Sequence, residues 1–230
     1  MAVFLWAGLG LAAGTLLPSL IAALPDREPE PDEGVRTPYR ILATASRLRT
    51  ILAVVTAVIW AVLGATLGWS PALPAFLVVA ALGIALAYID LREHRLPDRL
   101  VAAALAAGGL LLALAAPMTG GWTAYARAWL AAVLMFLGYL GLAMLRPTDL
   151  GMGDVKLAGV LGLMLGWLGW SSAILGAFLG FLFGGLAGVL LLLTGRAARR
   201  TPIPFGPFML LGALVAIAAG GPLLDAYLGR

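Results

Sequence analysis

The chain has 230 residues, of which 62% are hydrophobic and only 11% are charged, and its mean hydropathy is +1.02. Soluble domains contain about half apolar and a quarter charged residues, so this composition excludes an ordinary soluble protein. Repeated apolar segments, each long enough to cross a bilayer, predict an all-α, polytopic helical membrane protein. The formal charge of +4 does not require a nucleic-acid partner, because basic residues of membrane proteins first report orientation.

Eight apolar segments are predicted to span the membrane. The first covers residues 3–24, and because no basic residue precedes it we expect an uncleaved span rather than a signal peptide. The other seven lie at about 50–69, 73–90, 100–116, 125–145, 154–170, 172–194 and 205–222. Residues 25–49 contain five acidic residues, five basic residues and four prolines, a composition that predicts a loop rather than a folded domain.

The basic residues predict the orientation of these spans. Thirteen of the fifteen lie in the first, third, fifth and seventh loops, and only Arg127 and Arg230 lie on the opposite side. The positive-inside rule therefore makes the odd loops cytoplasmic and places both termini outside.

Cysteine and histidine set limits on the chemistry. The chain has no cysteine, which excludes disulfides, thiolate metal sites and a cysteine nucleophile, and its single histidine is His94. We therefore expect no metal and no cofactor. A metal held by Asp90 and His94 on one helix face is a minor alternative.

Acidic residues at predicted helix ends are the candidates for chemistry. Gly151-Met-Gly-Asp-Val-Lys-Leu157 places Asp154 and the only lysine, Lys156, where an apolar segment begins. An ionisable group at the mouth of a membrane segment is costly and usually functional. Asp90 closes the third predicted span, so the topology places it at the same membrane face as Asp154.

Two carboxylates in a partly dehydrated site cannot both ionise easily. One keeps a proton while the other stays charged, so the pair can deprotonate a water and protonate the carbonyl or departing group. Such a pair titrates as a unit and needs neither a metal nor a nucleophilic side chain. We expect Gly151 and Gly153 to let the backbone approach closely and bend where the helix begins.

Structural roles for these acids are the alternative. Asp154 alone is equally well explained as a helix cap, whereas an acid at a helix C-terminus, such as Asp90, is disfavoured by the helix dipole. Asp98 follows Leu96-Pro97 and is expected to be the N-cap of the next span. Asp149 is either a third acid near the site or a turn residue.

Four segments resemble, in order, the motifs of one family. Gly151-Met-Gly-Asp-Val-Lys-Leu157 resembles the GxGD signature of type IV prepilin peptidases, the bacterial leader peptidases that process pilins. The other resemblances are Ile89-Asp-Leu91 with Leu96-Pro-Asp98, Leu161-Gly-Leu-Met-Leu-Gly-Trp167, and Pro204-Phe-Gly-Pro-Phe208. The resemblance covers roughly residues 50–222.

The resemblance implies an activity and roles for individual residues. Asp90 and Asp154 would be the catalytic aspartates of a membrane endopeptidase, Gly151 and Gly153 would shape the loop that presents Asp154, and Lys156 would act electrostatically or bind the leader. The implied substrate is a membrane-inserted prepilin or pseudopilin with a short basic leader. Cleavage would occur at the cytoplasmic face of the bacterial inner membrane.

One segment departs from the family. Many members carry, after the first span, a cytoplasmic domain with paired zinc-binding cysteines that methylates the new N-terminus. Here residues 25–49 are short and contain no cysteine. We therefore expect residues 1–24 to form the first transmembrane helix, 25–49 a degenerate remnant of that domain, and 50–230 a seven-helix peptidase domain without methyltransferase activity.

Two other classes of membrane protein are less consistent with the sequence. Signal-peptide-peptidase and presenilin-type proteases pair GxGD with a Tyr-Asp and a later Pro-Ala-Leu, but Tyr88 and Asp90 are not adjacent and Pro71-Ala-Leu73 precedes both acids. A transporter or channel would use the two aspartates for ions or protons. Acids of transporters commonly lie near the midplane, whereas these lie at the predicted cytoplasmic boundary.

Overall fold

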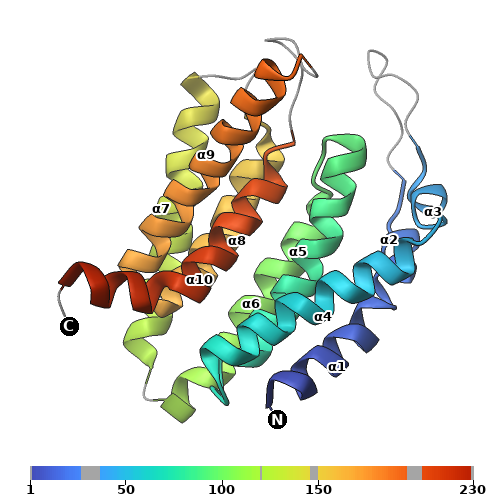
Figure 1. Ribbon diagram of the computed structural model, residues 1–230. Helices are drawn as coiled ribbons and strands as arrows, with labels where there is room; N and C mark the ends of the chain where they lie inside the picture. The colour runs from blue at the N-terminus through green and yellow to red at the C-terminus, as the bar shows by residue number, and fades with distance from the viewer. Residues whose placement is uncertain (1, 27–36, 120, 146–149, 196–203, 229–230) are drawn as a thin grey trace.

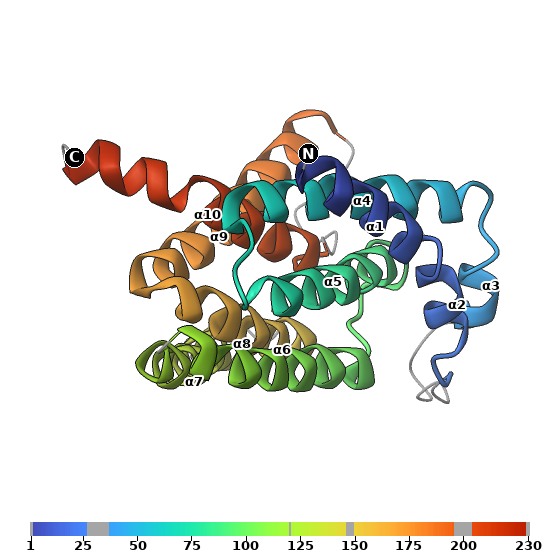
Figure 2. The ribbon, with the colours of Figure 1, turned by 90° about the horizontal axis from the view of Figure 1, so that it is seen from below.

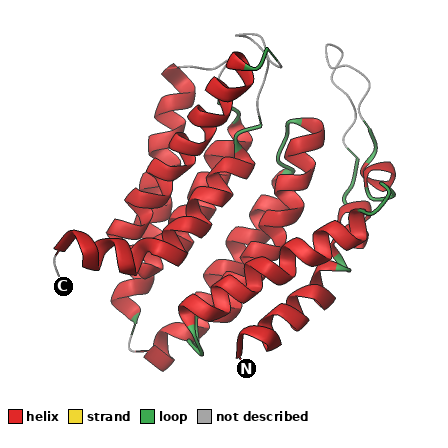
Figure 3. Cartoon of the chain, in the orientation of Figure 1, coloured by secondary structure: helices red, strands yellow, loops and turns green. Residues whose placement is uncertain are grey.

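The computed structural model describes residues 2–26, 37–119, 121–145, 150–195 and 204–228. These ranges fold into helices joined by short connections, with no strand among them (Figures 1 and 3). The helices are α1 (Ala2–Gly14), α2 (Leu17–Ala22), α3 (Tyr39–Leu42), α4 (Leu48–Leu67), α5 (Leu73–Glu93), α6 (Asp98–Thr119), α7 (Trp122–Leu145), α8 (Met152–Leu168), α9 (Trp170–Leu193) and α10 (Gly206–Leu228).

The helices confirm an all-α, polytopic membrane protein. Each of the eight predicted segments is helical, although the first is broken into α1 and α2. Six helical segments are long and apolar enough to cross a membrane, by length and composition. They are Val3–Ala22, Leu48–Leu67, Leu73–Glu93, Asp98–Thr119, Trp122–Leu145 and Trp170–Leu193. Two further helices are shorter than these six segments. Helix α8 has 17 residues, and the apolar segment of α10 is Gly206–Ala219.

Two boundaries differ from the prediction. Helix α5 was expected to end at Asp90 but continues to Glu93, and it ends where His94 adopts a left-handed conformation with φ of 52°. The predicted loop 25–49 contains the short helix α3, and α4 begins within it. Asp26 Oδ1 accepts the Tyr39 N–H at 2.8 Å and so connects the two described ends of this segment, while residues 27–36 lie outside the described residues.

Helix α8 is the central element of the bundle. Val155 and every residue from Leu157 to Trp167 are buried, and α8 contacts α6, α7, α9 and α10 (Figures 1 and 2). A helix that is hydrophobic on every side is expected to be surrounded by protein. The element that carries Asp154 is therefore the most enclosed of the helices in the described ranges.

Small residues and one arginine fix α8 against α7. A Cβ atom at Gly162 would lie 2.6 Å from the Ala131 carbonyl oxygen and 2.8 Å from Ala132 Cα, so a side chain there would collide with the backbone of α7. Arg127 of α7 donates to the carbonyl oxygens of Gly166 and Trp167 at 2.8 and 2.7 Å. A cation at a helix C-terminus is favourable, which gives a structural reason for a basic residue on the predicted outer side.

Substitution of Gly162 is expected to destabilise the fold. Gly162→Leu should lower the free energy of unfolding by about 1–3 kcal/mol or more, because the new side chain would meet the α7 backbone, which cannot rotate away. The control is Gly138→Leu on α7, since a Cβ atom at Gly138 meets no atom within 4 Å. Thermal unfolding of the detergent-solubilised chain measures both variants, and equal stability would contradict the packing described here.

Candidate active site

Asp90 is a buried carboxylate tied to a distant part of the chain. It lies in the last turn of α5 and is 4% exposed. The Gly206 N–H, at the start of α10, donates to Asp90 Oδ2 at 3.1 Å across 116 sequence positions. The first N–H groups of a helix have no partner within the helix, so Gly206 supplies a donor that α10 itself does not use. This bond stabilises a carboxylate at a helix C-terminus, where the dipole alone would disfavour it.

Asp154 occupies the first turn of α8. Its Oδ2 accepts the Gly151 N–H at 3.2 Å, which is the backward half of a capping box. Its Oδ1 is buried and has no hydrogen-bond partner among the described residues. A buried polar atom without a partner is unusual in a native protein and indicates a place for water or a ligand. Capping and a functional role are therefore compatible, because each uses a different oxygen.

The two aspartates line one polar cavity. It measures about 730 Å³ and lies where the end of α5 meets the start of α8. All five predicted site residues contribute to its wall: Asp90, Gly151, Gly153, Asp154 and Lys156. The remaining wall comes from residues 24–26, Tyr39, Met152 and residues 94–99. Asp149 lies outside the described residues.

The two glycines of the GxGD segment differ in what they permit. A Cβ atom at Gly153 would lie 2.9 Å from Leu96 Cβ, so the missing side chain lets α8 pack closely against the Leu96 segment. Gly151 has φ of −77° and ψ of 152°, an extended backbone that any residue adopts. A Cβ atom at Gly151 would lie 3.4 Å from Asp154 Oδ2, so a side chain at this position would occupy the space beside the carboxylate.

Lys156 pairs with Asp98 across the mouth of the cavity. Its Nζ lies 2.7 Å from Asp98 Oδ1, and this ion pair joins the start of α8 to the start of α6. Because Asp98 is exposed and Lys156 only partly buried, the pair contributes at most about 1 kcal/mol of stability. The expectation that Asp98 is an N-cap is wrong by one position, since Asp98 is already the first helical residue and Pro97 precedes it.

Few side chains at this site could bind a metal ion. His94 lines the same cavity as Asp90. In the part of the chain that the structure describes, no group of three or more His, Cys, Asp or Glu side chains is placed to hold a metal ion. The alternative of a metal between Asp90 and His94 therefore has no third protein ligand among these residues.

The start of α10 is a part of the site that sequence reasoning did not single out. The Phe205 ring lies 5.2 Å from the Phe181 ring, which stacks on Tyr139 at 5.2 Å, and these contacts hold the segment that precedes Gly206. A Cβ atom at Gly206 would lie 2.9 Å from Asp90 Oδ2. The signal was present in Pro204-Phe-Gly-Pro-Phe208, but the motif alone does not show which carboxylate its backbone reaches.

Comparison with known proteins identifies the family of this chain. The Type IV leader peptidase family matches residues 77–193, a range that contains Asp90 and Asp154 but not Gly206. A protein of Aeromonas salmonicida named "Prepilin leader peptidase/N-methyltransferase" is 33% identical over 168 residues, 71% of this chain and 54% of that protein. A protein of the same name from Legionella pneumophila is 30% identical over 152 residues, which are 64% of this chain and 50% of that protein. Another from Bacillus subtilis is 34% identical over 99 residues, which are 43% of this chain and 39% of that protein.

This chain spans about half the length of the Aeromonas and Legionella proteins. No solved structure matches it. The family match nevertheless covers more than half of the chain and includes both aspartates together with the GxGD segment. From its sequence and its helical architecture, the chain belongs to the type IV leader peptidase family.

Proposed function

We propose that this protein is a membrane aspartic endopeptidase that removes the short basic leader of prepilin-like proteins at the cytoplasmic face of the bacterial inner membrane. The observation that carries the proposal is the meeting of Asp90 and Asp154, from two different helices, in one polar cavity. The names of the relatives support a prepilin as the substrate. The basic residues of the odd loops support the cytoplasmic face.

The proposed mechanism uses the two carboxylates as one acid–base pair. One carboxylate is charged and takes a proton from a water molecule, whose oxygen attacks the carbonyl carbon of the scissile bond. The other is protonated and donates its proton to the carbonyl oxygen. The C–N bond then breaks as the departing amine takes the proton that the first carboxylate gained from water, and a hydroxyl of the tetrahedral intermediate returns a proton to the second carboxylate. The roles belong to the pair, so neither step is assigned to Asp90 or to Asp154 alone.

The unpartnered oxygen of Asp154 supports a place for this water. Oδ2 is held by the Gly151 N–H, while Oδ1 is buried without a partner among the described residues and belongs to a residue of the cavity wall. Asp90 is oriented in the same manner by the Gly206 N–H. Each carboxylate thus has one oxygen fixed by backbone, which orients the group before substrate binds.

We further propose that methyltransferase activity is absent. The support is the short, cysteine-free segment at residues 25–49, in the place where, by the resemblance, many family members carry a zinc-binding domain. No other segment between the first and second spans is available to form such a domain.

Both aspartates are expected to be required for cleavage. Asp90→Asn and Asp154→Asn should each reduce leader removal at least about hundredfold, because an amide cannot exchange the proton. Coexpression with a prepilin, followed by mass spectrometry of the new N-terminus, measures the loss. Glu93→Gln, an acid in the same last turn of α5 that does not line the cavity, is the matched control and should cleave at close to the wild-type rate. Wild-type cleavage by either Asp90→Asn or Asp154→Asn would overturn the proposal.

The orientation of Asp90 is expected to depend on Gly206. Gly206→Ala places a methyl group 2.9 Å from Asp90 Oδ2, so the carboxylate or the start of α10 must move. A displacement of this size should lower kcat about 10- to 100-fold. Gly185→Ala is the control, because a Cβ atom there meets nothing within 4 Å. Equal kcat for the two variants, at equal thermal stability, would show that this hydrogen bond does not position Asp90.

Methyl transfer provides a separate measurement. The purified chain, given a mature pilin and S-adenosylmethionine carrying a labelled methyl group, should transfer no label to the pilin N-terminus. A bifunctional relative such as the Aeromonas protein, assayed in parallel, tests whether the pilin and the conditions support transfer. Label transferred by this chain would refute the proposed loss of activity and leave the peptidase proposal intact.

A further inference from the structure

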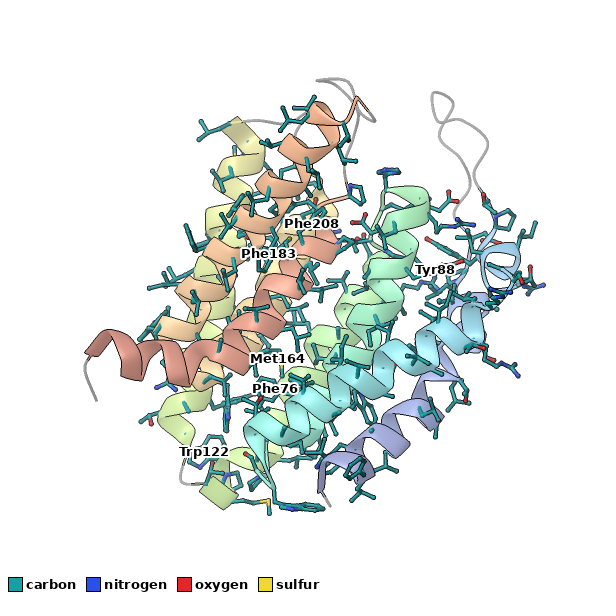
Figure 4. The ribbon with its side chains drawn as sticks, in the orientation of Figure 1. Phe76, Tyr88, Trp122, Met164, Phe183 and Phe208 are labelled. Carbon is teal, nitrogen blue, oxygen red and sulfur yellow. The ribbon has the colours of Figure 1, made fainter. Side chains whose placement is uncertain are left out.

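A second cavity runs between α4 and α10, with α5 and α8 as its floor. It measures about 350 Å³, and its lining is almost entirely aliphatic and aromatic. We call it the α4–α10 groove. Figure 4 shows Phe76 of α5 and Met164 of α8 in the space between the ribbons of α4 and α10. None of its lining residues lines the polar cavity of Asp90 and Asp154.

The groove follows the direction of α5. Its lining residues on α5 include Phe76, Ala80, Gly83, Ala87 and Leu91, which recur every three or four positions and form one continuous stripe. Phe76 and Leu91 are fifteen positions apart, so the stripe extends about 22 Å along the helix. This is a large part of the roughly 30 Å thickness of a bilayer core. An apolar groove of this length suits an apolar helix that lies along it.

One end of the groove lies next to the candidate active site along two helices. Leu91 lines the groove and directly follows Asp90, while Pro207 lines it and directly follows Gly206, the donor to Asp90. An apolar segment in the groove therefore ends beside the buried carboxylate. A lipid acyl chain would fill the same space but would have no reason to end at that carboxylate.

Another apolar cavity offers a different exit from the site. It measures about 400 Å³ and lies between α6, α7 and α8, and it shares Asp98 and Lys156 with the polar cavity. The ion pair between these two residues stands where this cavity meets the site. An apolar chain leaving the site by this route would pass two charged groups, whereas at the α4–α10 groove it meets Leu91 and Pro207.

We propose that the α4–α10 groove binds the apolar helical segment of the membrane-inserted substrate, next to the bond that is cleaved. This inference rests on the proposed function, because it assumes that the substrate is a prepilin whose apolar segment follows the cleavage point. The walls of the groove are accessible from the bilayer, since Val55 of α4 and Leu211 of α10 are 38% and 47% exposed.

Disulfide crosslinking locates the substrate, and the absence of native cysteine makes every introduced thiol unique. Leu211→Cys places a thiol in the groove, and Leu137→Cys places one in the cavity between α6, α7 and α8, at similar exposures of 47% and 53%. Each variant, in the Asp154→Asn background to retain substrate, is coexpressed with a prepilin that carries one cysteine in its apolar segment. Oxidation should give several-fold more crosslinked product for Leu211→Cys than for Leu137→Cys.

The outcomes separate this inference from the proposed function. The same prepilin is first incubated with the wild-type chain, and absence of leader removal would reject the proposed function itself. Leader removal combined with equal crosslinking, or with crosslinking only at Leu137→Cys, would overturn the groove while leaving the peptidase in place.

A steric variant gives a second readout. Val55→Trp fills the wall of the groove, whereas Val58→Trp, on the same helix and 57% exposed, lies outside it. The first should raise KM for the prepilin about tenfold with little change in kcat, as expected when ground-state and transition-state binding are lost equally. The second should leave both constants unchanged. Equal KM values for the two tryptophan variants, both folded, would contradict binding in the groove.

Discussion

The site depends on two backbone N–H groups at helix starts. A carboxylate that leaves water is costly unless donors replace the water, and each aspartate of this cavity receives one such donor from a glycine. Gly206 at the start of α10 serves Asp90, and Gly151 before α8 serves Asp154. The position of the Asp90 carboxylate is therefore set by how the end of α5 meets the start of α10, whereas the Asp154 carboxylate is held by the start of its own helix.

Helix α8 gives this meeting point its rigidity. It is buried along most of its length, and Gly162 allows contact with the backbone of α7. An acidic residue of its own, Asp154, lies in its first turn, and Arg127 of α7 donates to carbonyl oxygens of its last turn. Both arrangements favour the helix dipole, so the central helix is stabilised at each end as well as along its sides.

Sequence alone predicted the helical membrane architecture, because apolar runs of spanning length leave few other structures possible. It also placed Asp90 and Asp154 at one membrane face, since topology and loop charge require no knowledge of packing. It did not predict that Gly206 reaches Asp90 or that Lys156 pairs with Asp98, because topology and loop charge do not specify which groups of neighbouring helix ends come into contact. The end of α5 was misplaced because hydropathy falls at Asp90, while the helix continues until His94 turns the backbone.

The contact between Arg127 and Gly166 also provides a common reference level for α7 and α8, which lie side by side (Figure 1). Eighteen positions separate Arg127 from Leu145 at the end of α7, whereas twelve separate Gly166 from Asp154. At the rise of an α-helix these distances are about 27 and 18 Å, so Asp154 lies about 9 Å inside the level at which α7 ends. An extended chain covers that depth with about three residues, so the Asp154 carboxylate lies within reach of a short extended segment from the level of the α7 end.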